Sequence, residues 1–439
     1  MSETAADRLV EESDAKDGDL VRVSNERFDV IGTLMPYLVH EERNILSLKL
    51  ENGYNVGIKV DKSTTLKVIK RPARKGKIPK LVPKNSKLPT VALLGTGGTI
   101  ACWVDYTTGA VYPAQNVSDL AFSMPEIFDL ANIKARIVYQ LLSEDLEPKH
   151  WRRLAHQVAY SLNGEARGVV IPHGTDTMSY TASALAFMLK GLTGPVVLVG
   201  SQRSSDRPSS DAYLNLLASV RLAATADIKE VVVAMHKNSS DSAIAIHRGT
   251  KVRKMHTSKR DAFESLNAQP LGFVRGNKIE FTQAYHKEPS SKVVVDDKMD
   301  DRIKLVYVYP GCSLDWISKK DTHGLVLMGT GLGHAPRRLL QKIESLIESN
   351  VAVVMTSQCL SGRVNMNIYS TGRKLANLDV IPSEDMLPEV AYVKLMWILG
   401  HTRDPSEVKR LMLTNLAGEI STRIPPKKPL EGGLISQEE

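Results

Sequence analysis

Two short segments of this sequence place hydroxyl side chains next to glycines, directly after apolar runs. Residues 95–101 are Gly-Thr-Gly-Gly-Thr-Ile-Ala and follow the apolar run 91–94. Glycines let a backbone approach a bound ligand closely, and only Thr96 and Thr99 have side chains there that could attack a carbonyl carbon. Because ligands bind at the carboxyl ends of strands in open α/β sheets, we expect a catalytic site here, with Thr99 as its nucleophile.

A second segment repeats this arrangement. Residues 168–178 run from an apolar stretch into His173, Gly174, Thr175 and Asp176, and helical sequence follows. Threonine and aspartate are also favoured at the first positions of helices, so Thr175 and Asp176 could simply cap the helix that follows. Two strand-end loops that each present threonine beside glycine instead favour one shared site.

Two other interpretations of the first loop are open from its residues alone. A dinucleotide-binding G-x-G-x-x-G series starting at Gly95 would need glycine where the chain has Ile100, and the acidic residue expected about 20 positions later is missing. The loop could also be a purely structural glycine turn. A P-loop is not expected either, because Gly76-Lys77 is followed by Ile78, so ATP would have to bind another chain.

The composition is that of a globular protein with room for several domains. The chain has 439 residues, of which 42% are hydrophobic and 24% charged, and these are ordinary values. The net charge of +8 permits contact with nucleic acid without requiring it. Three scattered cysteines suggest a reducing, cytoplasmic environment and no metal site. The acidic first residues do not resemble a secretory signal, and no apolar run reaches the roughly 18 residues of a membrane span.

Hydrophobic patterning predicts a small β unit followed by α/β units. Five short alternating runs within residues 20–69 predict a small closed SH3-like β-barrel, which either binds a ligand or serves only as a packing module. Residues 71–87 are basic and contain three prolines, which predicts an extended linker that is a solvated tether or a phosphate contact. Beyond it, strand-like and helical runs alternate, as in a mostly parallel sheet covered by helices on both faces.

The predicted domains follow from these changes of pattern. Residues 287–302 are hydrophilic, and strand-like runs resume after them as a smaller unit. The boundaries are an acidic tail with the β-barrel (1–70), a basic linker (71–89), a first α/β domain with the active site (90–286), an inter-domain connection (287–302), a second α/β domain (303–422) and a tail (423–439).

The two threonine loops together resemble the paired signatures of the bacterial-type L-asparaginase family. The resemblance extends from about residue 91 to about residue 417 and includes segments 200–203, 270–272 and 329–336. It implies an asparaginase-like two-domain α/β unit, here preceded by the SH3-like β-barrel domain. It also implies cleavage of the side-chain amide of asparagine or glutamine by a threonine nucleophile.

The resemblance implies catalytic roles for four residues. Thr99 matches the nucleophile of the first signature, and this match is the reason for preferring it to Thr96. Thr175 and Asp176 match the pair in the second signature, and Lys254 matches a lysine that takes the proton when its amino group is neutral. Burial lowers the pKa of a lysine and a neighbouring carboxylate raises it, so the sequence leaves the protonation state open. No histidine is placed where it must act as the base, and we expect His173 to be structural.

Substrate-binding roles are implied by the same resemblance. Tyr106 matches a tyrosine in a loop that covers the substrate, and Ser143 and Glu144 match residues that hold the α-amino and α-carboxyl groups of the amide donor. Glu144 stands where hydrolytic asparaginases often have glutamine. Gly98 and Gly174 are expected to line the site through their backbones.

Three features fit one branch of the family better than a free-standing asparaginase: the N-terminal barrel and the segments 204–211 and 382–389. They resemble the amide-hydrolysing subunits of archaeal glutamyl-tRNA(Gln) amidotransferases, which convert Glu-tRNA(Gln) to Gln-tRNA(Gln). The resemblance implies a heterotetramer with two GatE-like partner subunits, a homodimeric core formed by the asparaginase-like domains, and tRNA(Gln) bound mainly by the partner. ATP and Mg²⁺ are expected on that partner, with no cofactor in this chain and glutamine or asparagine as the amide donor. The alternatives are a free-standing cytosolic L-asparaginase and an RNA-binding scaffold with an inactive site.

Overall fold

The computed structural model describes residues 4–16, 18–35, 44–51, 55–71, 84–97, 102–105, 110–113, 124–203, 210–288 and 290–424. Gly98, Thr99 and Tyr106 lie outside these ranges, as do most of the predicted linker and all residues after 424. Within the ranges, no helix combines the length and apolar character needed to cross a membrane.

The N-terminal unit is a five-stranded antiparallel sheet in the order β4-β3-β2-β1-β5. Its strands are β1 (Leu20–Ser24), β2 (Asp29–Leu34), β3 (Ile45–Lys49), β4 (Asn55–Lys59) and β5 (Thr65–Lys70). Strand β1 pairs with both β2 and β5, and its alternate residues Val21 and Val23 are buried against Leu48 in the core of the unit. The small antiparallel β domain predicted from the alternating runs is therefore confirmed.

The acidic N-terminal segment, predicted from the sequence as a tail, contains a helix packed against the β unit. Helix α1 (Ala5–Glu12) begins with a capping box, in which the side chains of Thr4 and Asp7 each accept from the other's backbone N–H. Ala6 is buried in the core of the β unit. The Thr-x-x-Asp spacing resembles a known helix-start pattern and predicts this helix, whereas the acidic composition of the segment does not.

The first α/β unit is built on an eight-stranded sheet in the order β18-β17-β14-β13-β12-β10-β6-β9. Strands β9, β6, β10, β12 and β13 are parallel, and β14, β17 and β18 continue antiparallel at one edge. The strands are β6 (Thr90–Gly95), β9 (Asn132–Ile137), β10 (Ala166–Pro172), β12 (Val196–Val199), β13 (Val231–His236), β14 (Ile244–Arg248), β17 (Gly272–Arg275) and β18 (Lys278–Phe281). A separate hairpin pairs β7 (Cys102–Asp105) with β8 (Ala110–Pro113).

Helices cover both faces of this sheet, as predicted. The helices are α3 (Pro148–Leu162), α4 (Met178–Met188) and α5 (Ala212–Thr225). In β10, Val169 and Ile171 pack in the cluster that contains α3 and α4, whereas Val170 packs in the cluster that contains α5. A strand buried on both faces needs an unbroken apolar run, and residues 168–171 supply it.

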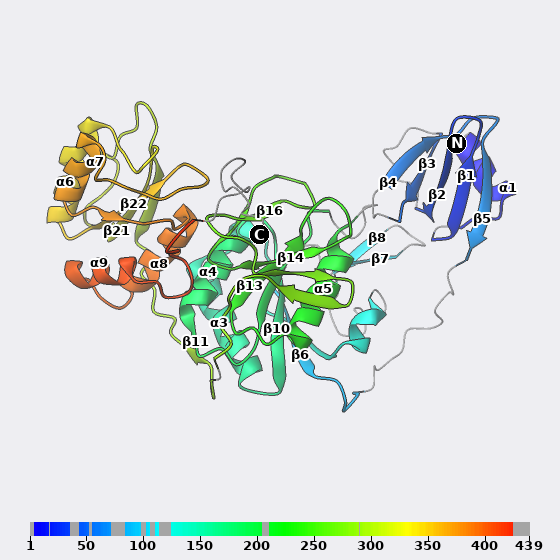
Figure 1. The fold of residues 1–439 in the computed structure, drawn as a ribbon, viewed down its shortest axis with the longest axis horizontal. Helices are drawn as coiled ribbons and strands as arrows, with labels where there is room; N and C mark the ends of the chain where they lie inside the picture. Colours follow the sequence, from blue (N-terminus) through cyan, green and yellow to red (C-terminus); the bar gives the residue numbers. More distant parts are fainter. Residues whose placement is uncertain are drawn as a thin grey trace, which may run out of the picture.

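The second α/β unit has four parallel strands in the order β20-β21-β22-β23. Its elements are β20 (Ile303–Tyr307), β21 (Gly324–Gly329), α6 (Leu340–Glu348), β22 (Ala352–Ser357), α7 (Ser370–Asn377), β23 (Ile381–Pro382), α8 (Pro388–Leu399) and α9 (Pro405–Leu413). Helix α8 lies between the two sheets and packs against α4 on one side and β20–β22 on the other (Figure 1). The connection between the units includes β19 (Val294–Val295), which pairs with β11 (Leu189–Lys190) directly after α4.

Candidate active site

The two threonine loops meet at the carboxyl edge of the large sheet, because β6 and β10 are parallel neighbours. Thr96, directly after β6, donates from its backbone N–H and from Oγ1 to the carbonyl oxygen of Pro172, at 3.1 and 2.9 Å. The Thr96 side chain is only 1% exposed. Its hydroxyl is thus used to join the two strand ends, and it is not available to a substrate.

Two glycines bring the loops close to the segment that contains Ser143. A Cβ atom on Gly97, whose φ is +116°, would overlap the backbone of Leu141, and a Cβ atom on Gly174 would lie 2.7 Å from Cβ of Ser143. The hydroxyl of Thr177 donates to the carbonyl oxygen of Ser143 at 2.6 Å. Ser143 is buried and Glu144 is exposed. The structure therefore places Ser143 and Gly174 in contact, with Glu144 beside them on the surface.

Lys254 joins the second loop from a separate hairpin. It ends β15 (Val252–Lys254), which pairs with β16 (Phe263–Ser265). Its amino group donates to Oγ1 of Thr175 at 2.9 Å and to Oδ1 of Asp176 at 2.8 Å. The side chain of Lys254 is 15% exposed, whereas that of Asp176 is 67% exposed. The structure thus brings together three of the four predicted catalytic residues, while Thr99 lies outside the described residues.

Thr175 and Asp176 are not the cap of the following helix. Helix α4 begins at Met178, its N-cap residue is Thr177, and no side chain there makes a capping hydrogen bond. The helix-capping interpretation of the Thr-Asp pair is therefore wrong. Within the described residues, the hydrogen bonds of this pair go to Lys254, as expected if the two residues act in the site.

His173 has a structural role, as expected. Nδ1 lies 2.6 Å from the carbonyl oxygen of Gly174, and Nε2 lies 2.9 Å from Oγ1 of Thr181. Complete burial lowers the pKa of His173 to about 4, in spite of its bond to Gly174. The ring is therefore neutral at pH 7, with Nδ1 donating and Nε2 accepting, and both nitrogens are occupied.

A cavity of about 350 Å³ opens beside the Lys254–Asp176 pair. Arg253 and the buried Glu389 of α8 line it together with Tyr180. Nε of Arg253 lies 3.7 Å from Oε1 of Glu389, and burial raises the pKa of Glu389 although Arg253 lowers it. Burial also raises the pKa of Tyr180 to about 12.

Within the described ranges there is no cluster of three or more His, Cys, Asp or Glu side chains that could hold a metal ion.

Sequence reasoning missed the contacts that Arg253 and Glu389 make across the two α/β units. Arg253 is next to Lys254 in the sequence, and Glu389 ends the segment 382–389 that resembles one branch of the family. Nothing in either segment indicates that the two pack together.

Known proteins are similar to this chain over both α/β units. The family model "Asparaginase, N-terminal" matches residues 90–287 and the model "Glutaminase/Asparaginase C-terminal domain" matches residues 302–412. A solved structure of the L-asparaginase from Thermococcus kodakarensis aligns with a TM-score of 0.68 and 32% identity, covering 76% of this chain and 99% of that one. The fold and the Thr-Asp-Lys arrangement thus define a protein of the asparaginase class.

Residues that precede both asparaginase models indicate a narrower family. The model "GatD N-terminal domain" matches residues 15–69. The D subunit of glutamyl-tRNA(Gln) amidotransferase from Pyrococcus abyssi is 51% identical over 426 residues, covering 94% of this chain and 97% of that protein. The protein of the same name from Methanopyrus kandleri is 47% identical over 433 residues, covering 94% of each chain. The chain belongs to the GatD family, the D subunits of glutamyl-tRNA(Gln) amidotransferases.

Proposed function

We propose that this chain releases ammonia from an amide donor as the GatD component of a glutamyl-tRNA(Gln) amidotransferase. Its family membership supports this function over a free-standing L-asparaginase, as does the N-terminal unit, which matches the GatD N-terminal model and precedes the two asparaginase models. The observation that carries the chemistry is the position of the Lys254 amino group, within 2.9 Å of both Thr175 and Asp176.

The proposed reaction begins with attack of the Thr99 hydroxyl on the carboxamide carbon. An unactivated hydroxyl is a weak nucleophile, so Lys254, in its neutral form and held by Thr175 and Asp176, accepts the proton as the oxygen–carbon bond forms. The carbon–nitrogen bond then breaks, and the leaving group takes the proton to become ammonia. Water hydrolyses the resulting ester and restores the threonine. Backbone N–H groups of the glycine loop are natural donors to the oxyanion, each contributing about 2.7–4 kcal/mol.

Thr99 is the proposed nucleophile partly because Thr96 is engaged elsewhere. The loop offers two hydroxyls, and that of Thr96 is buried and donates to Pro172. Ser143 and Gly174 are proposed to hold the α-amino and α-carboxyl end of glutamine or asparagine, and Glu144 and Tyr106 are proposed to complete this binding. Glu144 is exposed beside Ser143, a position that fits recognition of an α-amino group.

The proposed assembly supplies the second half of the reaction. A GatE-like partner, present in two copies with two copies of this chain, would bind tRNA(Gln), ATP and Mg²⁺ and use the ammonia made here. The asparaginase-like units would form the homodimeric core, and the complex would act in the cytoplasm. Two of the three cysteines, Cys312 and Cys359, are free, a state that suits a reducing compartment.

The test is ammonia release from glutamine and from asparagine by the full chain, with and without the partner subunit and Glu-tRNA(Gln). We expect release to depend strongly on both additions. Vigorous hydrolysis by the isolated chain, unchanged by partner and tRNA, would instead identify a free-standing asparaginase. Thr99→Ala should abolish release while leaving the fold and partner binding intact, and full activity in that variant would exclude Thr99 as the nucleophile.

A further inference from the structure

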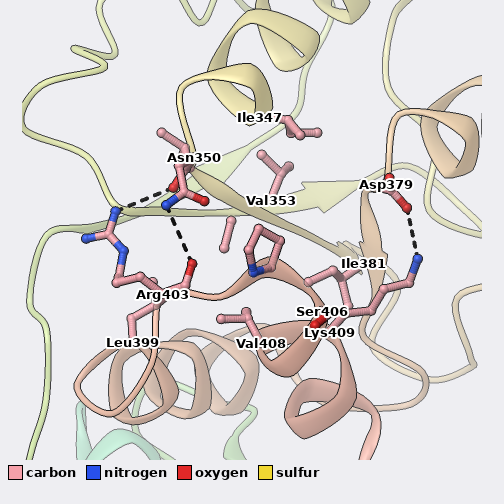
Figure 2. A pocket seen from close by; sticks show the side chains of 13 residues that line it. Ile347, Asn350, Val353, Asp379, Ile381, Leu399, Arg403, Ser406, Val408 and Lys409 are labelled. Carbon is pink, nitrogen blue, oxygen red and sulfur yellow. Dashed lines mark hydrogen bonds and ion pairs between the residues drawn. The ribbon is translucent and has the colours of Figure 1, made fainter.

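The second α/β unit contains a cavity of about 490 Å³ that shares no residue with the cavity beside Lys254. It lies at the amino ends of β22 and β23, beneath the first turn of α9 (Figure 2). A volume of this size is in the range of small-molecule sites, which are commonly about 300–1,000 Å³. The cavity is therefore large enough for a ligand of its own.

The body of this cavity is apolar. Its lining comes from α6, β22, β23, α8 and α9, whose side chains converge on one space (Figure 2). The apolar lining residues are Ile347, Val353, Ile381, Leu399, Pro405 and Val408. Packed protein interiors rarely leave empty apolar space of this size, and aliphatic side chains of this kind would bury a hydrocarbon chain favourably. The lining therefore favours a ligand that has an aliphatic chain.

Arg403 places a positive charge at one end of the cavity, and its contacts within the protein are long. Its Nε atom is buried and has no hydrogen-bond partner among the described residues. Its other contacts are long: 3.4 Å to the carbonyl oxygen of Asn350 and 3.7 Å to Asp300. Asp300 already accepts hydrogen bonds from Arg302 at 3.1 Å and from His323 at 2.5 Å, so it does not require Arg403.

The opposite end of the cavity is electrically balanced. There Lys409 lies 3.0 Å from Asp379, and Figure 2 shows this pair across the apolar lining from Arg403. At the Arg403 end, Arg403 and Arg302 share the single carboxylate of Asp300, so one guanidinium charge remains in excess there. A guanidinium matches a planar carboxylate through two parallel hydrogen bonds, whereas a doubly charged phosphate would need more than one surplus cation.

From these contacts we infer that the cavity binds an aliphatic carboxylate, with its chain among the apolar side chains and its carboxylate on Arg403. Such a site belongs to the second α/β unit alone and does not depend on the amide chemistry proposed for the first. It gives this unit a ligand-binding role in addition to packing against the first unit through α8.

The probe for this site is sodium octanoate, titrated into the full chain by isothermal calorimetry. We expect saturable binding, which Arg403→Gln weakens by about tenfold or more, because a hydrogen bond to a charged group contributes about 1.5–3 kcal/mol. Octanamide, with the same body and no charge, should bind the parent chain and Arg403→Gln equally. Arg410→Gln is the matched control, because Arg410 lies on α9, which follows Arg403 closely in the chain, pairs with Glu407 and does not line the cavity.

A second variant tests the apolar body independently. Ala352 lines the cavity at the start of β22, and Ala352→Leu should fill part of the space and abolish binding of both probes. The inference is overturned if octanoate does not bind the parent chain saturably, or if it binds Arg403→Gln as tightly as the parent. It is also overturned if saturating partner subunit displaces octanoate, because the cavity would then belong to a protein interface.

Discussion

The amino group of Lys251 lies 2.8 Å from Oδ2 of Asp385, and the two side chains are 1% and 0% exposed. Lys251 directly precedes β15, which ends with Lys254, whereas Asp385 precedes α8 of the second α/β unit. The other oxygen of Asp385 accepts from the backbone N–H of Ser421 at 2.9 Å. This buried ion pair therefore fixes the strand of the proposed catalytic lysine against the second unit.

Asp385→Asn should destabilise the chain by about 3–5 kcal/mol, because it leaves the buried charge of Lys251 without its partner. Denaturant unfolding measures the loss. Asp379→Asn is the control, since its pair with Lys409 is exposed and such pairs contribute about 0–1 kcal/mol. Lys251→Met combined with Asp385→Leu should recover most of the lost stability. If Asp385→Asn and Asp379→Asn lowered the free energy of unfolding equally, the buried Lys251–Asp385 pair would not have the importance assigned to it here.

Thr96→Val and Thr99→Ala should separate structure from chemistry within one loop. Thr96→Val removes only the Thr96 hydroxyl bond to Pro172, so we expect a cost of about 0.5–1.5 kcal/mol and retained ammonia release. Thr99→Ala should give the opposite pattern, with normal stability and no release. Thermal unfolding and an ammonia assay on both variants decide the matter, and loss of release in Thr96→Val with an intact fold would reopen the choice of nucleophile.

Lys254→Met should lower the rate of ammonia release by about 10²–10⁴, the range of general acid–base catalysis. Methionine keeps an unbranched stem but leaves Thr175 and Asp176 without the amino group. Lys259→Met is the matched control, because Lys259 is exposed in the loop that follows β15. The measurement is the maximal rate with partner and Glu-tRNA(Gln) present, and equal rates for the two variants would exclude Lys254 from the chemistry.

The sequence predicted the sheets better than it predicted the contacts between units. Apolar runs such as 91–94 and 168–171 are buried on both sides, so local pattern alone locates β6 and β10 to within a residue or two. The partners Lys251 and Asp385 are 134 residues apart, and nothing in the local pattern of either segment specifies the other. Contacts of this kind depend on how α8 packs between the sheets, which only the assembled fold determines.

The position of one loop of the candidate site could be predicted from local sequence, but its contact with Lys254 could not. Thr175 and Asp176 follow a strand in the sequence, so the place of their loop could be derived, although helix capping was an equally good explanation for the residues themselves. Lys254 lies within residues 248–257, a basic segment whose composition alone suggests a solvated loop or a phosphate contact. Its place in the site came from the family resemblance, and the structure supplies the distances to Thr175 and Asp176 that the sequence could not.

Stability should fall as the pH is lowered from about 6.5 toward about 4, because two histidines are buried in neutral form. Burial lowers the pKa of His247, like that of His173, to about 4. Between the folded and unfolded pKa values the unfolded chain binds more protons, so each histidine removes about 1.4 kcal/mol per pH unit on acidification. His247→Leu should reduce that slope by one such increment, as measured by denaturant unfolding at several pH values. An unchanged slope would show that His247 does not contribute.

Gly174→Ala should weaken binding of the amide donor without unfolding the chain. The added methyl group would lie 2.7 Å from Cβ and 2.9 Å from Oγ of Ser143, so Ser143 must move away from its present position. A displacement of about 1 Å can cost on the order of 10² in rate when a group positions the substrate. We expect a higher KM for glutamine, and Ser143→Ala alone should raise KM in the same direction. If Gly174→Ala folds normally and leaves KM unchanged, Ser143 does not hold the donor.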